Sequence, residues 1–331
     1  MSKQKIRWGI ISTAAIGRRA VIPAIHASLN GQLTGVASRD GEKAARFARE
    51  TGIPRAFSSY EALLDDPEID AVYNPLPNSL HHEWTIKAAQ AGKHILCEKP
   101  LALNAAQCAE MIHAAQQNNV LLMEAFMYRF HPRSEQIFSM VHVGRLGEVR
   151  LIQAGFTFRL INPANIRLSY ELGGGALMDV GCYCVNVSRT LAQAEPEAVQ
   201  AHAHWASSGV DDQLVGSLRF PNGLIAQIDC SLTMERRMNY QVAGTLGWIT
   251  VPQAFLPGTA PVAFTEMSAA GETTHEVAGA DQYRLMVEHF ADCILTRQPL
   301  RYPPQEGMAN MRVIEALYRS AKSSGGWVEV L

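Results

Sequence analysis

Two residues of opposite charge, Glu98 and Lys99, stand directly before a proline at residue 100. The apolar run at residues 94–97 is typical of a short buried strand. A helical pattern follows it, with Asn104 as cap and Gln107 as its reciprocal partner. The charged pair therefore lies beyond the carboxyl end of a strand, an edge at which open parallel sheets bind ligands. A lysine there can act on a bound substrate, whereas a turn with an exposed charge pair explains the same residues equally well.

A second stretch with chemical meaning follows the apolar run IRWGII at residues 6–11, which we expect to be a buried strand. Between this run and a helix that begins at residue 18, the spacing is that of G-x-G-x-x-G, the dinucleotide fingerprint. Serine and alanine occupy its first two glycine positions, so an ordinary strand–helix turn is the competing interpretation. The residues that would contact a dinucleotide here are Ser12, Thr13, Ala14, Ile16 and Gly17.

The end of the next expected strand, residues 32–37, bears on which dinucleotide would bind. Ser38 and Arg39 follow it, where an acid would bind the ribose 2′-hydroxyl of NAD and an arginine suits the 2′-phosphate of NADP. A guanidinium offers a planar fork of donors to phosphate oxygens. Asp40 is expected instead to cap the helix at residues 41–50. We therefore predict NADP rather than NAD, the alternative for Arg39 being a solvated side chain at a helix start.

A third loop at the same edge is expected after the strand at residues 69–74. Leu76, Asn78 and His81 are its candidates for cofactor contact. His81 and His82 point in different directions from one helix, so they cannot both serve one site. With further strands at residues 94–97 and 120–125, five or six strands alternate with helices. This alternation predicts a doubly wound parallel sheet, and we place that domain at residues 1–126.

Length, composition and cysteine usage limit the class of protein. The chain has 331 residues, of which 47% are hydrophobic and 18% charged, and its net charge is −2. Two domains are therefore expected, and charge gives no argument for a nucleic-acid or membrane partner. No stretch approaches the roughly 20 apolar residues of a membrane span. The start has no apolar secretory segment and the six cysteines form no CxxC pair. We expect a cytoplasmic protein with reduced thiols and no metal site.

The second half, residues 127–331, is expected to form an α/β domain with a mainly antiparallel sheet. The turn Pro221-Asn222-Gly223 joins two strand-like runs, which is a hairpin signal. Earlier, three glycines at residues 173–175 precede a helix on which Asp179 and Tyr183 stand four residues apart and share a face. Further candidates for ligand contact are Arg129 in the interdomain connection, Phe156 on a long strand, and Arg167 and Tyr170 in an irregular polar segment.

Four segments together resemble the glucose–fructose oxidoreductase and inositol dehydrogenase family, often written Gfo/Idh/MocA. They are the turn at residues 9–17, PLPNSLH at 75–81, Glu98-Lys99-Pro100, and GGGALMDVGCY at 173–183. The second half looks similar to the branch of dimeric dihydrodiol dehydrogenase and NADP-dependent D-xylose dehydrogenase. The resemblance implies an N-terminal Rossmann domain and a C-terminal α/β domain built on an open, mainly antiparallel sheet. It also implies a catalytic Lys99 with a cis bond to Pro100, and a cofactor contact at Glu98.

The resemblance further implies an activity, NADP-dependent hydride transfer at a secondary or anomeric hydroxyl or carbonyl of a sugar or related cyclic polyol. Much of the family carries Asp-x-x-x-His, but here Tyr183 replaces the histidine and is the expected proton donor. Lys99 would assist it by its charge, since a free tyrosine has a pKa near 10, and Asp179 would orient a hydroxyl or a water. Alternatively Lys99 is the base and Tyr183 only binds the hydroxyl.

Other functions also fit these residues. The chain is alternatively a trans-dihydrodiol dehydrogenase or a keto-sugar reductase of the same family, or an NADP-binding sensor without catalysis. The paired Lys99 and Tyr183 argue against a sensor, which has no use for a base. The expected partners are a small sugar-like substrate and a second copy of the chain. We expect a homodimer or larger homo-oligomer that forms through the C-terminal sheet, with neither nucleic acid nor membrane as a partner.

Overall fold

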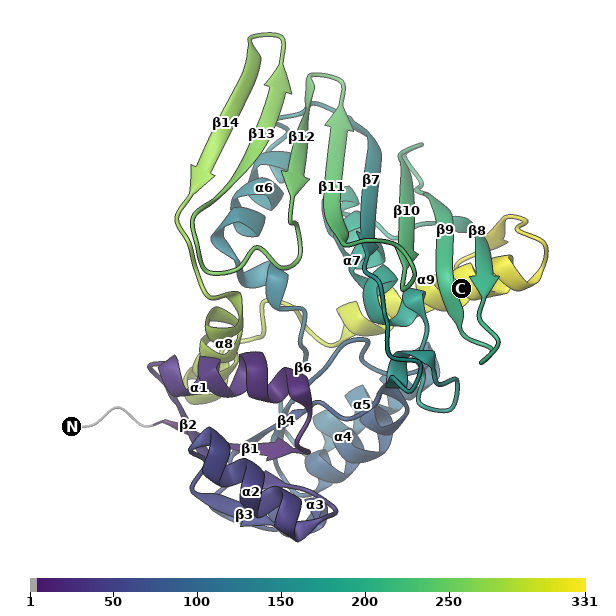
Figure 1. The fold of residues 1–331 in the computed structure, drawn as a ribbon. Coiled ribbons are helices and arrows are strands. Elements are labelled where there is room, and N and C mark those ends of the chain that lie inside the picture. Colours follow the sequence, from purple (N-terminus) through teal and green to yellow (C-terminus); the bar gives the residue numbers. More distant parts are fainter. Residues whose placement is uncertain (1–4) are drawn as a thin grey trace. The chain divides into compact units, whose positions relative to one another are not determined.

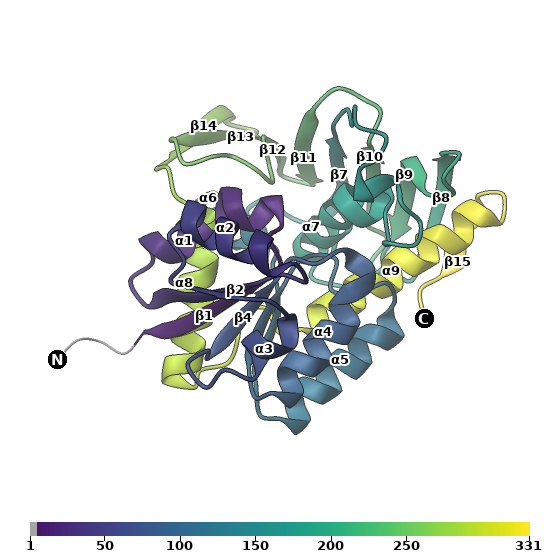
Figure 2. The ribbon, with the colours of Figure 1, turned by 60° about the horizontal axis from the view of Figure 1, so that its bottom comes forward.

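A computed structural model describes residues 5–331 (Figures 1 and 2). The chain divides into two compact units, Met1–Met127 with Asp281–Met308, and Tyr128–Ala280 with Ala309–Leu331. The division expected from the sequence, at residues 126 and 127, leaves residues 281–308 with the second half. In the structure, helix α8 (Gln282–Thr296) packs on the first unit instead, where Phe290 contacts Trp8 with ring centroids 5.7 Å apart. The apolar face of α8 finds its cover there, although it is far away in sequence.

The first unit is built on a six-stranded sheet, and every neighbouring pair of its strands is parallel. Its order is β3-β2-β1-β4-β5-β6. The strands are β1 (Ile6–Ile11), β2 (Gly31–Ala37), β3 (Arg55–Phe57), β4 (Ala71–Asn74), β5 (His94–Cys97) and β6 (Leu122–Glu124). The expected doubly wound sheet is confirmed. Because the strand order reverses between β1 and β4, the loops after these two strands flank the place where such sheets bind ligands.

Helices cover both faces of this sheet (Figure 2). They are η1 (Gly17–Val21), which continues into α1 (Ile22–Ala27), and α2 (Gly41–Thr51), α3 (Tyr60–Leu64), α4 (His81–Gln90), α5 (Ala105–Gln117) and α8. Two predicted caps are confirmed, since Asp40 accepts from the Lys43 N–H at 3.0 Å and Asn104 from the Gln107 N–H at 2.8 Å. The Gln107 side chain in turn accepts from the N–H of residue 103, so the capping box closes one residue early.

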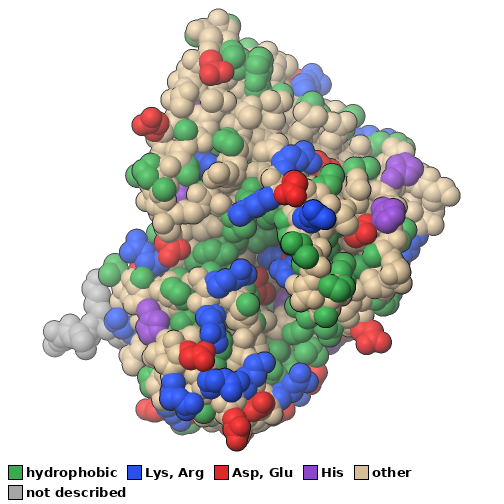
Figure 3. All heavy atoms as spheres, in the orientation of Figure 1, with side chains coloured by type: hydrophobic (Ala, Val, Ile, Leu, Met, Phe, Trp, Pro, Cys, Tyr) green, Lys and Arg blue, Asp and Glu red, His purple; other side chains and the backbone are tan. Residues whose placement is uncertain are grey.

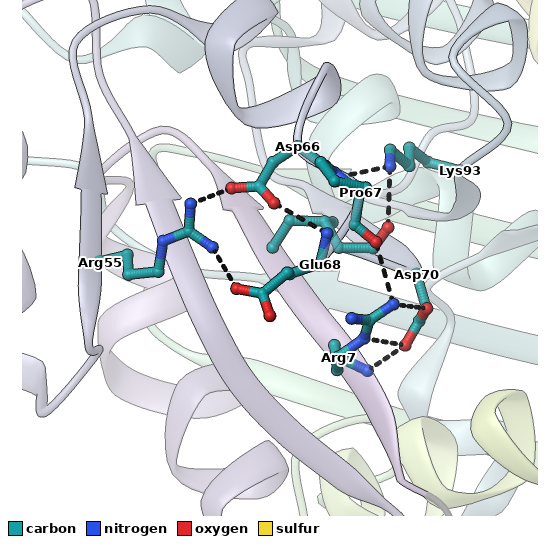
Figure 4. Close-up of polar contacts among 8 residues, drawn as sticks. Arg7, Arg55, Asp66, Pro67, Glu68, Asp70 and Lys93 are labelled. Carbon is teal, nitrogen blue, oxygen red and sulfur yellow. Dashed lines mark hydrogen bonds and ion pairs between the residues drawn. The ribbon is translucent and has the colours of Figure 1, made fainter.

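An ion-pair network ties together the opposite edge of the sheet, where the strands begin (Figure 4). Arg7 of β1 donates to Asp70 at 2.7 Å, and Lys93 donates to the backbone carbonyl of Asp66 at 2.7 Å. Arg55 of β3 pairs with the Asp66 carboxylate. These contacts link the starts of β1, β3, β4 and β5, so the charges at this edge tie neighbouring strands together.

The second unit is built on a mixed sheet of nine strands, in which only β7 and β10 run parallel among the described pairs. Its order is β14-β13-β12-β11-β7-β10-β9-β8-β15. The strands are β7 (Val149–Thr157), β8 (Ala198–Trp205), β9 (Asp211–Arg219), β10 (Ile225–Ser231), β11 (Arg237–Gly244), β12 (Gly247–Pro252), β13 (Val262–Ser268), β14 (Gly271–Val277) and β15 (Val328–Glu329). The mainly antiparallel sheet is confirmed, as is the hairpin between β9 and β10.

Helices cover one face of this sheet and leave the other open (Figure 1). They are α6 (Pro132–His142), α7 (Cys182–Ala192), which continues η5 (Leu177–Gly181), and α9 (Gln305–Lys322). Short 3-10 turns lie at η2 (Asn78–Leu80), η3 (Met127–Phe130) and η4 (Ile166–Leu168). The sequence pattern predicted no strand after residue 251, so β13 and the edge strand β14 were missed. Residues 271–275 of β14 are mostly exposed and polar and show no alternation of polar and apolar residues.

Within residues 5–331, no helix is both long enough and apolar enough to cross a membrane. In the same range, no group of three or more His, Cys, Asp or Glu side chains is arranged to hold a metal ion.

Candidate active site

Four loops of the first unit bring the expected cofactor residues to one edge of its sheet. Residues 12–17 follow β1, Ser38 and Arg39 follow β2, residues 76–78 follow β4, and Glu98 with Lys99 follows β5. All four strands are parallel neighbours, so their carboxyl ends meet at the same edge. The sheet thus gathers into one region side chains that are far apart in the sequence.

The loop after β1 has the backbone of a phosphate-binding turn although it lacks two glycines. Ser12 takes a φ of 91°, in the left-handed region that favours glycine. Its Oγ is buried and has no hydrogen-bond partner among the described residues. A buried hydroxyl beside the start of the helix at residues 15–27 is a donor suited to a phosphate oxygen. The turn therefore fits the pyrophosphate of a dinucleotide.

The loop after β2 presents a positive charge. Ser38 is buried, while Arg39 is exposed and lies beside the phenol of Tyr60. Burial raises the pKa of Tyr60, and the charge and hydrogen bond of Arg39 oppose that rise. Blue side chains gather over α1 and α2 in Figure 3. The exposed basic residues of this region are Arg18, Arg19, Arg39, Lys43, Arg46 and Arg49. Such a surface suits an additional phosphate.

The loop that carries Lys99 is held on both sides of its proline. The Lys99–Pro100 bond is cis, as expected. The carbonyl of Pro100 lies 2.9 Å from Nδ1 of His81, and the N–H of Leu101 donates to Oε1 of Glu124 at 2.8 Å. Because His81 and Glu124 belong to α4 and β6, two neighbouring elements fix the backbone around Lys99, and the side chain itself is half-buried.

Glu98 is fixed as firmly as its neighbour. The hydroxyl of Tyr73, on β4, donates to Oε1 of Glu98 at 2.5 Å. Burial raises the pKa of Tyr73 well above its usual range, and the charge of Glu98 adds to the rise. The same two causes raise the pKa of Tyr283 in the first turn of α8. Both phenols are therefore neutral at pH 7, and that of Tyr73 donates to Glu98.

His81 and Leu76 are buried, and the His81 ring contacts the backbone of two loops at this edge of the sheet. We expected both to contact the cofactor, but His81 is fully buried and Leu76 is 6% exposed. Besides Pro100, the His81 ring contacts the carbonyl of Leu76, at 2.8 Å from Nε2. Burial lowers the pKa of His81 to about 4, so the ring is neutral at pH 7 and donates to one of the two carbonyls. Asn78, the third residue of that loop, is half-buried in η2.

In the second unit, Tyr183 stands on the first turn of α7 among aromatic rings. The Tyr183 ring lies 5.5 Å from that of Phe156 on β7, 5.3 Å from Phe255 and 5.9 Å from Tyr128. Tyr183 is 5% exposed. A phenol in such surroundings is shielded from water, which strengthens the effect of any nearby charge on it. Phe156 therefore packs against Tyr183, and its contact with a substrate stays a prediction.

Asp179 and Arg167, which the sequence analysis treated separately, form an ion pair. Nε of Arg167 donates to Oδ2 of Asp179 at 2.5 Å. The guanidinium of Arg167 therefore orients the carboxylate of Asp179. Tyr170 does not join this group of side chains, since it is 68% exposed on the other part of its loop. Arg129 is buried within η3.

Comparison with known proteins shows the family to which this chain belongs. Residues 6–126 match the model of an oxidoreductase family with an NAD-binding Rossmann fold, GFO_IDH_MocA, and residues 135–250 match the GFO/IDH/MocA C-terminal domain. The chain belongs to the Gfo/Idh/MocA family of oxidoreductases. It is 39% identical to D-xylose 1-dehydrogenase (NADP(+)) 2 of Haloferax volcanii, over 98% of this chain and 99% of that protein.

Two further Gfo/Idh/MocA relatives are informative. The chain is 37% identical to trans-1,2-dihydrobenzene-1,2-diol dehydrogenase of Xenopus tropicalis, over 74% of this chain and 75% of that protein. Its structure resembles that of KijD10, a 3-ketoreductase from Actinomadura kijaniata in complex with NADP and TDP-benzene. The TM-score is 0.91 at 30% identity, over 96% of this chain and 98% of that one. The resemblance inferred from four short segments is confirmed over the whole chain.

The sequence analysis missed several residues that support the candidate residues within each unit. Phe255 and Tyr128 surround Tyr183, and Glu124 holds the Lys99 loop. Phe255 lies in the loop after β12, whose carbonyls at residues 252–254 accept hydrogen bonds from the buried Arg133. No local pattern marks these residues, because each reaches the site through tertiary contacts. The buried acid Glu124 at the end of a short apolar strand is the one signal that was available.

Proposed function

We propose that this protein is an NADP-dependent oxidoreductase that acts on a secondary or anomeric hydroxyl, or the corresponding carbonyl, of a sugar or related cyclic polyol. One observation carries the proposal. Lys99 in its pinned loop and Tyr183 in its aromatic surroundings occur in a chain 39% identical, over nearly its whole length, to an NADP-dependent D-xylose dehydrogenase. Ser12, with its buried unpartnered hydroxyl, and Arg39, on an exposed basic surface, support a phosphorylated dinucleotide as cofactor.

The chain's own residues would bind the cofactor and move the proton. NADP, when bound, accepts or supplies the hydride. Residues 12–17 would hold its pyrophosphate and Arg39 its 2′-phosphate, while Asn78, Glu98 and Arg129 would line the rest of its site. Tyr183 would take the proton from the substrate hydroxyl in oxidation and return it in reduction. Lys99 would stabilise tyrosinate and the developing alkoxide, and Asp179, oriented by Arg167, would orient the substrate.

A keto-sugar reductase is the second candidate, because the same groups serve the reverse direction and the fold resembles a 3-ketoreductase with NADP bound. A dihydrodiol dehydrogenase rests on the 37% identity to the Xenopus enzyme. A single substrate panel separates these activities, since their substrates are an aldose, a keto sugar and a trans-dihydrodiol.

We also propose that two copies of the chain pair through the open face of the nine-stranded sheet. Strand residues alternate between its two faces, and the helices cover only one of them. On the open face Val215, Ile225 and Trp248 are 44%, 40% and 43% exposed. Apolar side chains spread over neighbouring strands among polar residues are typical of a protein–protein interface.

The test is turnover followed at the absorbance band of reduced nicotinamide. The full chain is mixed with NADP⁺ or NAD⁺ and D-xylose, other aldoses, inositol or a trans-dihydrodiol, and separately with NADPH and keto sugars. We expect reaction with NADP and one sugar class. Lys99→Met should lower turnover at least about 100-fold and leave NADP affinity nearly unchanged, since general acid–base help is worth roughly 10²–10⁴-fold.

Lys87→Met is the matched control, because Lys87 lies on α4 and pairs with Glu83 at the surface. It should leave turnover unchanged. Binding of NADP without turnover of any compound would favour a sensor over an enzyme. Full activity of Lys99→Met would remove Lys99 from the mechanism and leave the family assignment intact.

A further inference from the structure

A buried carboxylate outside the residues considered so far holds the start of the helix that carries Tyr183. Asp211, the first residue of β9, is 1% exposed. Its Oδ2 accepts from the Leu177 N–H at 2.7 Å, and its Oδ1 accepts from the hydroxyl of Tyr318 on α9 at 2.6 Å. Both carboxylate oxygens of Asp211 therefore accept hydrogen bonds within the second unit, one from the backbone of η5 and one from a side chain of α9.

The helix needs this contact because it begins without a local cap. Leu177 is the first residue of η5, and the residue at the N-cap position, Ala176, makes no side-chain capping bond. The first N–H groups of any helix lack partners within the helix, and a negative charge is favourable there. Asp211 supplies from a distant strand what Ser, Asp or Asn usually supplies at the cap itself.

The glycines before the helix fit this arrangement. Gly175 takes a φ of 125°, and a Cβ there would overlap Oδ1 of Asp211. A Cβ at Gly174 would overlap the carbonyl oxygen of Arg167, which also accepts from the Gly175 N–H at 2.8 Å. The guanidinium of Arg167 pairs in turn with Asp179. The glycines therefore let Asp211 and the Arg167 segment approach the helix start together.

We propose that Asp211, held by Tyr318, is a positioning residue of the active centre that caps the helix of Asp179 and Tyr183 and so places both side chains. Asp211 itself touches neither of those side chains in any described contact. The inference rests on the proposed function, because it assigns Asp211 a role through Tyr183 and Asp179. A misplacement of about 1 Å in a catalytic group can cost about 100-fold in rate, so a distant cap can control turnover.

Substitutions can distinguish the effect of the Asp211 charge from the effect of its two hydrogen bonds. Burial raises the pKa of Asp211 to about 6, and the hydrogen bonds from Tyr318 and Leu177 oppose that rise. The other ionisable group that bears on it is the neighbouring Asp212, whose charge adds to the rise. Asparagine can accept from the Leu177 N–H and donate to the phenol oxygen without a charge, whereas alanine removes both contacts.

The experiment compares Asp211→Ala, Asp211→Asn and Tyr318→Phe in the full chain. We measure kcat and KM with NADP⁺ and D-xylose, or with the panel sugar that reacts fastest, and the Kd for NADP. Hydrogen exchange of the amides at residues 177–183 is followed by mass spectrometry. Asp211→Ala should lower kcat about 10–100-fold, leave the Kd for NADP unchanged and speed exchange in that segment at least about tenfold.

Asp211→Asn should recover most of the kcat lost by Asp211→Ala, and Tyr318→Phe should lower kcat at least about threefold. Asp212→Asn is the matched control, because that side chain pairs with His204 and makes neither of the two hydrogen bonds of Asp211. Wild-type kcat in Asp211→Ala, or an unchanged exchange rate at residues 177–183, would overturn the proposal. If Asp211→Ala does not fold, a wild-type kcat in Tyr318→Phe would overturn the proposal instead. A wild type without turnover would instead refute the proposed function, while the exchange data would still test the cap.

Discussion

At the scale of single residues, the site departs from the usual pattern at two positions. Ser12 adopts the backbone of the glycine it replaces, with a φ of 91°, and adds a buried hydroxyl. Tyr183 replaces the usual histidine and lies among aromatic rings. In both cases the residue is a candidate because of its position in the motif rather than because of its residue type. A phenol needs a neighbouring cation to work as a base near pH 7, which gives Lys99 its proposed role.

We predict that Arg39 sets the preference for NADP over NAD, and the variant Arg39→Asp tests this prediction. The exchange removes a guanidinium suited to the 2′-phosphate and adds a carboxylate, which repels that phosphate and suits a ribose 2′-hydroxyl. We expect the ratio of kcat/KM for NADP over NAD to fall at least about tenfold, which corresponds to about 1.4 kcal/mol. Kinetics with each cofactor measure this ratio.

The control for this charge change is Arg49→Asp in the last turn of α2, where an exposed arginine undergoes the same reversal. It should leave the ratio unchanged. An equal loss of kcat/KM with both cofactors in Arg39→Asp would contradict a contact with the 2′-phosphate and would indicate that Arg39 supports the fold, for instance through Tyr60.

At the scale of elements, helix α6 begins on a titratable cap. Nδ1 of His131 accepts from the Arg133 N–H at 3.1 Å, and Pro132 occupies the first helical position. His131 is 1% exposed, and burial, aided by the charge of Arg133, lowers its pKa from 6.5 to about 4. Protonation of Nδ1 would break the cap, so the folded state keeps the ring neutral.

This cap predicts a loss of stability in mild acid. The pKa of His131 is lower in the folded than in the unfolded chain, so its contribution is complete above pH 6.5 and is lost as the pH falls toward 4. The fall of the pKa from 6.5 to about 4 limits the contribution to the free energy of unfolding to about 3 kcal/mol. Denaturant unfolding between pH 7 and 4.5 measures it. His131→Asn, a cap that does not titrate, should flatten this dependence, while His142→Asn at the exposed end of α6 should not.

The helices and strands show which features of this fold could be predicted from its sequence. β1 and β5 are where their apolar runs predict them, and the caps at Asp40 and Asn104 follow from local chemistry. Local signals failed where a contact joins distant segments. Helix α8 returns to the first unit, and Asp211 caps a helix that begins 34 residues earlier. The candidate site residues could be proposed from the sequence because their motifs are local, whereas the residues that support them were missed because tertiary packing selects them.

At the scale of the whole molecule, the open sheet face predicts an assembly. A second copy laid on this face would bury the exposed apolar side chains and the polar residues between them, such as Gln153 and Gln227, which share a hydrogen bond of 2.9 Å. The double variant Val215→Lys, Ile225→Lys places like charges on adjacent strands, because the two residues lie on β9 and β10. Like charges brought together across an isologous interface repel, so we expect the variant to be monomeric where the wild type is a dimer.

Sedimentation velocity at several protein concentrations distinguishes the two states. Val143→Lys, which changes a 78% exposed apolar residue after α6, is the control and should sediment as the wild type does. A dimeric double variant would exclude this face as the interface, and a monomeric wild type would exclude the assembly itself. The site residues lie outside the pair that is changed, so a monomer that retains turnover would show that each copy carries a complete active centre, whereas a monomer without turnover would show that pairing supports the site.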